Sequence, residues 1–97
     1  MPETFNDACH AIAQEIADLV VSKQGDYGTG NILAFGEKGI VVRVNDKVER
    51  LKNLTWNNEG VPKNEAIEDS WKDLAGYAVV ALMLRRGVFT LPLKDDK

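Results

Sequence analysis

Acidic side chains gather at two places in the sequence, and their spacing suggests metal chemistry. Asp46 and Glu49 are three residues apart, and Asp69 and Asp73 are four apart. Positions three or four apart share one face of a helix, so each pair would present two carboxylates side by side. Carboxylate oxygens suit Mg²⁺ or Mn²⁺, and magnesium commonly takes one or two carboxylates together with substrate phosphates. The alternative is a solvated helix face whose acids form ordinary ion pairs with neighbouring lysines and arginines.

Basic residues in the same region could bind phosphate. Arg43, Lys47 and Arg50 follow one another at intervals of four and three residues. Such a row can meet several phosphate oxygens at once, and the arginine fork matches that geometry better than lysine does. The alternative is that each cation pairs with a nearby carboxylate and does nothing else.

A glycine-rich stretch, "SKQGDYGTGNILAFGEKG", precedes this region and holds five glycines. A glycine-rich turn lets backbone amides approach an anion closely. Tyr27, inside the stretch, offers a ring to stack on a base or a hydroxyl to contact a phosphate. No strand is expected before the stretch, so it does not match a dinucleotide-binding fingerprint. The alternative is that the stretch is a long loop with no binding role. Loops of this length inside compact domains are usually functional or mobile.

The element that leads into this stretch is an amphipathic helix over about residues 4–24. Its apolar positions recur every three or four residues: Phe5, Ala8, Ile12, Ile16, Leu19 and Val20. This period is that of a helix with one buried face. Thr4 or Asn6 could cap its first turn, and Gly25 follows where helices often end in a left-handed residue.

Two more helices are expected, over about residues 40–55 and 64–86, with the glycine-rich connection at 25–39 and an irregular, charged tail at 88–97. The last helix has a broad apolar face, made by Ile67, Trp71, Leu74, Tyr77, Ala78, Ala81, Leu82 and Leu84. The fold is therefore predicted to be all-α and a single domain, 1–97. A helix that is apolar around much of its circumference also suggests contact with a second copy of the chain.

Composition excludes several classes of function. The 97 residues are 44% hydrophobic, and no apolar stretch approaches the length that spans a bilayer, so no membrane partner is expected. A net charge of −3 argues against stable binding of duplex nucleic acid. Cys9 is the single cysteine, which leaves no internal disulfide, and the first residues lack a signal-peptide pattern. We therefore expect a cytoplasmic protein.

Three segments together resemble a known family. "KQGDYG", "GIVVRVNDKVERLKNL" and "EAIEDSWKDLAGYAVVAL", within residues 23–82, resemble the "nucleotide modification associated domain" family of phages and bacteria. The pattern of that family runs Lys, Asp-Tyr-Gly, Arg, Asp-Lys, Arg-Leu and a final Asp-Leu-Ala-x-Tyr. The family is similar in turn to all-helical nucleoside-triphosphate pyrophosphohydrolases of the MazG and dimeric dUTPase kind. Those enzymes hold magnesium with Glu-x-x-Glu on one helix and Glu-x-x-Asp on the next.

The resemblance implies a MazG-like helical bundle completed by oligomerisation, as a homodimer or a higher homo-oligomer. It also implies a site. Metal ligands would be Asp46, Glu49, Asp69 and Asp73, and the residues around the nucleotide would be Lys23, Asp26, Tyr27, Arg43, Lys47 and Arg50. Glu49 or Asp69 would orient or deprotonate the attacking water. Ser70 departs from the pattern, because it stands where the second motif has its glutamate.

The function that the resemblance implies is magnesium-dependent hydrolysis of a canonical or modified nucleoside triphosphate. Water would attack the α-phosphorus and release the monophosphate and pyrophosphate, with the metal neutralising charge. One alternative is a non-catalytic protein that sequesters a nucleotide or serves as an accessory subunit in DNA-base modification. The other is an interaction module without nucleotide chemistry.

Overall fold

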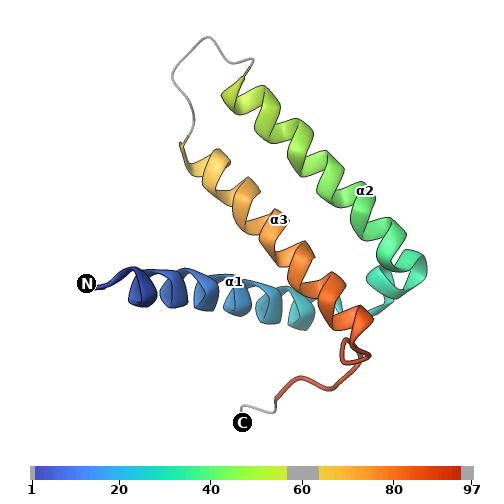
Figure 1. The fold of residues 1–97 in the computed structure, drawn as a ribbon. Coiled ribbons are helices and arrows are strands. Elements are labelled where there is room, and N and C mark those ends of the chain that lie inside the picture. Colours follow the sequence, from blue (N-terminus) through green and yellow to red (C-terminus); the bar gives the residue numbers. More distant parts are fainter. Residues whose placement is uncertain (1, 57–63, 95–97) are drawn as a thin grey trace.

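Three helices make up the fold. The computed structural model describes residues 2–56 and 64–94, and within them the elements are α1 (Phe5–Tyr27), α2 (Gly30–Thr55) and α3 (Asn64–Arg85). No strand occurs in these ranges, so the prediction of an all-α fold is confirmed. Figure 1 shows α2 and α3 running antiparallel, while α1 crosses the C-terminal half of α3. None of the helices in the described ranges is long and apolar enough to cross a membrane.

Helix α1 begins at a side-chain cap and ends at a left-handed glycine. The backbone N–H of Asp7 donates a 3.0 Å hydrogen bond to Thr4 Oγ1, which satisfies one of the free donors of the first turn. Gly28, with φ of 69°, follows the last residue, and its N–H donates to the carbonyl of Gln24. Of the two candidate caps, Thr4 and Asn6, Thr4 is therefore the cap. The expected stop at Gly25 is wrong, because Gly25 is helical and the positive φ falls three residues later.

The expected connection over residues 25–39 is also wrong. Only Gly28 and Thr29 separate α1 from α2, and the glycine-rich segment forms the first turns of α2. This helix turns a corner at Gly36, whose φ of 61° and ψ of −149° suit glycine almost alone. At the same corner a Cβ on Gly39 would lie 2.6 Å from the Cβ of Phe35, so only glycine fits there without a shift. Two of the glycines thus permit a kink instead of a loop.

The helices pack through a small core. Among the described residues the buried hydrophobic side chains are Ile16, Ile40, Leu51 and Phe89. Helix α1 approaches α3 closely at Gly76, where an added Cβ would lie 3.4 Å from Val20 Cγ2. Buried Ser70 satisfies its hydroxyl within α3 by donating to the carbonyl of Ala66 at 2.8 Å. The residue that departs from the pyrophosphohydrolase pattern is therefore a packing residue here.

The segment after α3 returns to the helices. Gly87, with φ of 70°, donates to the carbonyl of Leu84, and Val88 N–H donates to the carbonyl of Met83. This pair of bonds is the Schellman pattern that commonly ends a helix. The turn places Phe89 in the core at 5% exposure. The tail has no helix or strand through residue 94, as expected, but one of its residues helps to close the core; residues 95–97 lie outside the described ranges.

Candidate functional site

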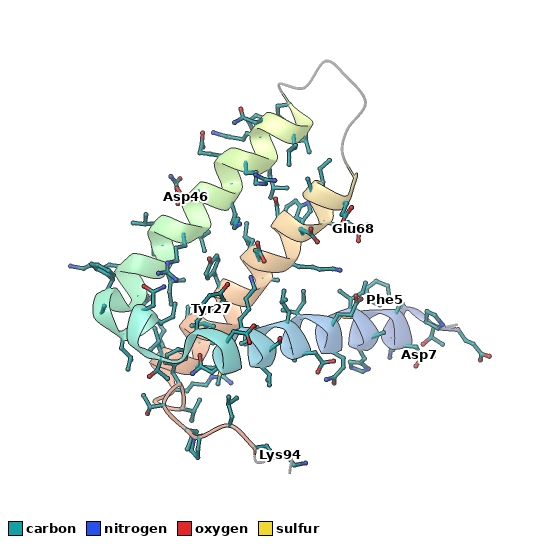
Figure 2. The ribbon with its side chains drawn as sticks, turned by 180° about the vertical axis from the view of Figure 1, so that it is seen from behind. Phe5, Asp7, Tyr27, Asp46, Glu68 and Lys94 are labelled. Atoms are coloured by element: carbon teal, nitrogen blue, oxygen red, sulfur yellow. The ribbon has the colours of Figure 1, made fainter. Side chains whose placement is uncertain are left out.

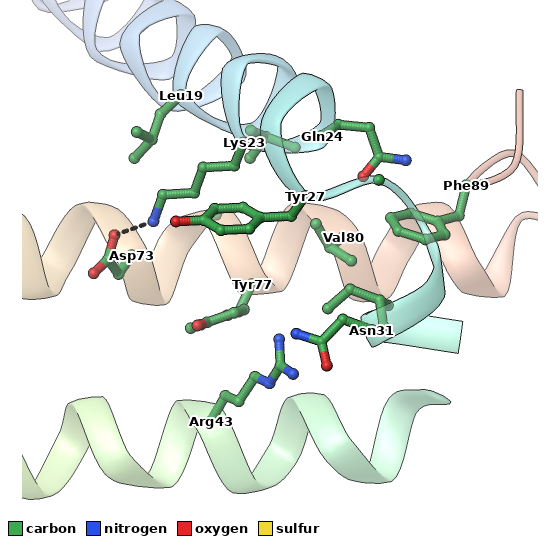
Figure 3. A pocket seen from close by; sticks show the side chains of 14 residues that line it. Leu19, Lys23, Gln24, Tyr27, Asn31, Arg43, Asp73, Tyr77, Val80 and Phe89 are labelled. Carbon is green, nitrogen blue, oxygen red and sulfur yellow. Dashed lines mark hydrogen bonds and ion pairs between the residues drawn. The ribbon is translucent and has the colours of Figure 1, made fainter. Parts of the chain in front are cut away.

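A pocket of about 300 Å³ lies where the three helices meet. It is bounded by the end of α1, the kinked start of α2, the second half of α3 and Phe89 of the tail (Figure 3). Its lining residues are Leu19, Val20, Lys23, Gln24, Tyr27, Gly28, Asn31, Ile32, Arg43, Asp73, Gly76, Tyr77, Val80 and Phe89. Apolar walls with a few convergent polar groups are typical of small-molecule sites, and this volume is at the small end of their range.

One carboxylate joins all three helices at the edge of this pocket. Asp73 on α3 accepts from Lys23 Nζ of α1 at 3.0 Å through Oδ1, and its Oδ2 lies 2.9 Å from Lys47 Nζ of α2. Burial of the Asp73 side chain acts to raise its pKa, but the hydrogen bonds and positive charges of Lys47 and Lys23 outweigh it. The pKa of Asp73 is therefore below its ordinary value. The carboxylate stays ionised and holds the two ammonium groups side by side.

Arg43 is the cation in the pocket without a carboxylate partner. It is half-buried, lines the cavity and, within the described ranges, makes no ion pair or side-chain hydrogen bond. Figure 3 shows its side chain reaching from α2 toward Asn31 of the kinked segment. A guanidinium that is partly removed from water and not neutralised by the protein is well placed to take an anionic ligand.

Two tyrosines supply aromatic surface to the same pocket. Tyr27 is 75% exposed at the mouth, whereas Tyr77 is half-buried. Figure 3 shows both rings in the space between Lys23 and Arg43. Aromatic rings of this kind can stack on a nucleobase, and their hydroxyls can hydrogen-bond a ligand. The pocket thus combines flat apolar surface with positive charge.

The structure brings together some of the nucleotide-binding residues predicted from the sequence. Lys23, Tyr27 and Arg43 line the pocket, and Lys47 borders it through Asp73. The lining does not include Asp26 or Arg50, which are exposed.

The predicted metal ligands are spread out. Asp46 is exposed on the side of α2 away from α3 (Figure 2), and Glu49 is exposed beside Lys52, with 3.2 Å between Lys52 Nζ and Glu49 Oε2. Asp69 is also exposed, and both oxygens of Asp73 are engaged by lysines. Across residues 2–56 and 64–94, no three His, Cys, Asp or Glu side chains form a group that could hold a metal ion. This donor set does not fit a protein-held magnesium ion as it stands, and magnesium binding remains a prediction.

Sequence reasoning missed several pocket residues, among them Tyr77, Asn31 and Phe89. Tyr77 was assigned to an apolar face, although it lies four residues after Asp73 and so shares its side of α3. Asn31 was taken as part of a loop, and Phe89 as part of an irregular tail. Nothing local in the sequence indicates that the last two meet at one cavity, because the kink and the return of the tail bring them there.

The carboxylate of Asp73 should stabilise the fold in a pH-dependent way. We expect Asp73→Asn to lower the free energy of unfolding by about 1–2 kcal/mol, because two charge-assisted hydrogen bonds are weakened at a partly exposed site. In the folded protein the pKa of Asp73 lies below its ordinary value of 3.8. The stabilisation by Asp73 is therefore complete above pH 3.8, and it is lost as the pH falls through the lowered pKa of the folded state. Urea unfolding at neutral and acidic pH measures both effects.

The matched control is Glu68→Gln, an exposed carboxylate on the same helix (Figure 2). It should change stability by less than about 0.5 kcal/mol. Equal losses in the two variants, or a loss in Asp73→Asn that persists unchanged at the most acidic pH, would show that Asp73 does not join the helices as described.

Comparison of the chain with models of protein families, with curated proteins and with solved structures finds no match.

Proposed function

We propose that the protein binds a nucleotide in the pocket between its three helices. The observation that supports this most is Arg43, a half-buried cation without a protein partner in the described ranges, in a cavity that also presents two tyrosine rings. A nucleotide joins a flat base to phosphate, so it matches both features at once. Simple phosphate would leave the aromatic surface unused, and an uncharged aromatic molecule would leave Arg43 unpaired.

The local charge favours an anion even though the whole chain is acidic. Lys23, Lys47 and Arg43 carry three positive charges around the single carboxylate of Asp73, which leaves two positive charges at the pocket. The chain as a whole has a net charge of −3. A small anion can use this confined positive region, whereas a duplex would also meet the acidic surface around it.

Binding is supported better than turnover. Hydrolysis of a nucleoside triphosphate needs a metal at the phosphates, and the four predicted ligands do not gather in this structure. We keep pyrophosphohydrolase activity as the second candidate because Mg²⁺ can arrive with the substrate phosphates and then needs only one or two protein carboxylates. Asp73 borders the pocket but is engaged by two lysines, so a metal would have to displace them.

We also propose that the protein acts in the cytoplasm as a homo-oligomer, without a membrane partner. The chain alone buries few large side chains in the described ranges, which is the observation that supports association. The surface involved is derived in the next subsection.

Removing the unpaired guanidinium should weaken nucleotide binding sharply. We expect Arg43→Ala to raise the dissociation constant at least about tenfold, because a charge-assisted hydrogen bond contributes about 1.5–3 kcal/mol. Isothermal titration calorimetry with a panel of canonical and modified deoxynucleoside mono- and triphosphates, with and without Mg²⁺, measures the loss. Tyr27→Ala should weaken binding of nucleotides while leaving any binding of inorganic phosphate unchanged.

Arg86→Ala is the control, since it removes the same charge from an exposed position outside the pocket lining. It should leave the dissociation constant within about twofold. A pyrophosphate assay on the same panel separates the two candidates: release that is lost in Glu49→Gln selects the hydrolase, and binding without release selects the non-catalytic protein. If no nucleotide binds, both candidates fail and an interaction module remains.

A further inference from the structure

The apolar stripe of α1 continues past the part of the helix that packs on α3. Ile16 is buried at 8% exposure, and Leu19 and Val20 are half-buried in the wall of the pocket. Phe5 and Ile12 belong to the same stripe, because they precede Leu19 by intervals of seven residues, which is close to two helical turns. Yet Phe5 is 85% exposed and Ile12 is 59% exposed. Figure 1 shows why: the N-terminal half of α1 diverges from α3 and extends beyond the other two helices.

The molecule as a whole exposes too much surface for a compact monomer. Its accessible area is 7671 Å² at a mass of 10.7 kDa. A folded monomer of that mass exposes about 5,500 Å², so the excess is about 2,200 Å². The radius of gyration agrees, because the value of 15.4 Å exceeds the roughly 12.5 Å of a compact domain of this length.

This excess matches what a homodimer buries. Obligate homodimer interfaces bury about 2,000–5,000 Å² in total, or about 1,000–2,500 Å² from each partner. We propose that the face of α1 carrying Phe5 and Ile12 is covered by a second copy of the chain. The seven-residue spacing of Phe5, Ile12 and Leu19 is the spacing with which paired helices interdigitate. This assigns the contact to α1, whereas the sequence pattern had pointed to α3.

Charge favours an isologous pairing with the two α1 helices antiparallel. The start of α1 is acidic, with Glu3 and Asp7, whereas the region where it packs on α3 also holds lysines, since Lys23 pairs with Asp73 and Lys72 with Glu15. A two-fold axis near Ile12 would place the acidic end of each copy toward the lysine-bearing region of the other. A parallel pairing would instead set the two acidic ends against each other.

A charge placed in the stripe should separate the copies. Sedimentation equilibrium of the full chain should give a dimer for the wild type, and Ile12→Glu should raise the dimer dissociation constant at least about tenfold, because two carboxylates would be desolvated near the axis. Val21→Glu is the matched control: Val21 is 57% exposed, close to the value for Ile12, but lies on the opposite side of α1. It should leave the dissociation constant within about twofold.

Two further measurements keep the test decisive. Circular dichroism checks that the Ile12→Glu variant keeps its helices. If that variant loses helix, the dimer measurement is made on Phe5→Ala, which changes a more exposed site of the same stripe. Cys9 is exposed and lies on the stripe between Phe5 and Ile12, so its alkylation rate in the wild type should fall as protein concentration rises. A monomeric wild type, or dissociation by Val21→Glu and not by Ile12→Glu, overturns the proposal. None of these measurements involves a nucleotide, so their outcome is separate from that of the binding test.

Discussion

Phe89→Ala should lower the melting temperature by more than about 10 °C. Replacing a buried phenylalanine by alanine costs about 3–5 kcal/mol, and each kcal/mol corresponds to about 4–8 °C in a domain of this size. Phe89 is one of the four buried hydrophobic side chains among the described residues, at 5% exposure. The cost should be near the upper end of that range because Phe89 lies beside the pocket, where little else can move in to fill the space.

Leu91→Ala provides the comparison within the same tail. Leu91 is 65% exposed, so its truncation should change the melting temperature by no more than about 4 °C. Thermal unfolding followed by circular dichroism at equal protein concentration measures both variants. If the two variants melt alike, the tail does not close the core.

Gly36→Ala should lower the free energy of unfolding. The direction of this change tests whether α2 is kinked. At φ of 61° and ψ of −149° a side chain introduces strain of about 1–3 kcal/mol. In a straight helix the same substitution would instead stabilise by roughly 1 kcal/mol, because alanine favours the helix over glycine. Urea unfolding therefore distinguishes the kinked α2 from a straight one by the direction of the change.

Gly30→Ala is the internal control for this experiment. Gly30 begins α2, has no positive φ, and an added Cβ there meets no atom within 4 Å. It should be neutral or stabilising by up to about 1 kcal/mol. A stabilising Gly36→Ala that resembles Gly30→Ala would mean that α2 is straight and that residues 30–35 do not turn over the pocket.

The kink matters to the site because it places the first turns of α2 at the pocket. Asn31 and Ile32 line the cavity from this segment, which lies between Gly28 and Gly36, both with positive φ. After the corner, Glu37 is held by Arg85 near the end of α3, with 3.1 Å between Arg85 Nη2 and Glu37 Oε2. The glycines that looked like a phosphate-binding loop therefore act mainly by shaping the backbone, and of the five only Gly28 lines the pocket.

Local patterns in the sequence were enough to predict the three helices. Apolar residues at intervals of three and four, a threonine at the cap and the polar stretch before Asn64 are all properties of neighbours along the chain. The same kind of pattern placed Lys23, Tyr27 and Arg43 among the candidate site residues, because charge and aromatic character can be recognised without knowing the fold. These parts of the prediction needed no long-range information.

What those residues do together depends on contacts between helices. Lys23 and Asp73 are fifty residues apart, and their ion pair exists because α1 crosses α3 at Gly76. Asp73 was read as a metal ligand from its spacing, yet packing gives it two lysine partners instead. Glycines were read as a loop because glycine weakens a helix, while the contacts around the corner allow a kinked helix to form. Neighbouring residues along the chain were enough to indicate three helical segments, but not that residues 30–39 belong to the second of them. The pocket, its unpaired arginine and the uncovered face of α1 depend on where the helices cross, and that crossing is set by contacts between residues far apart in the chain.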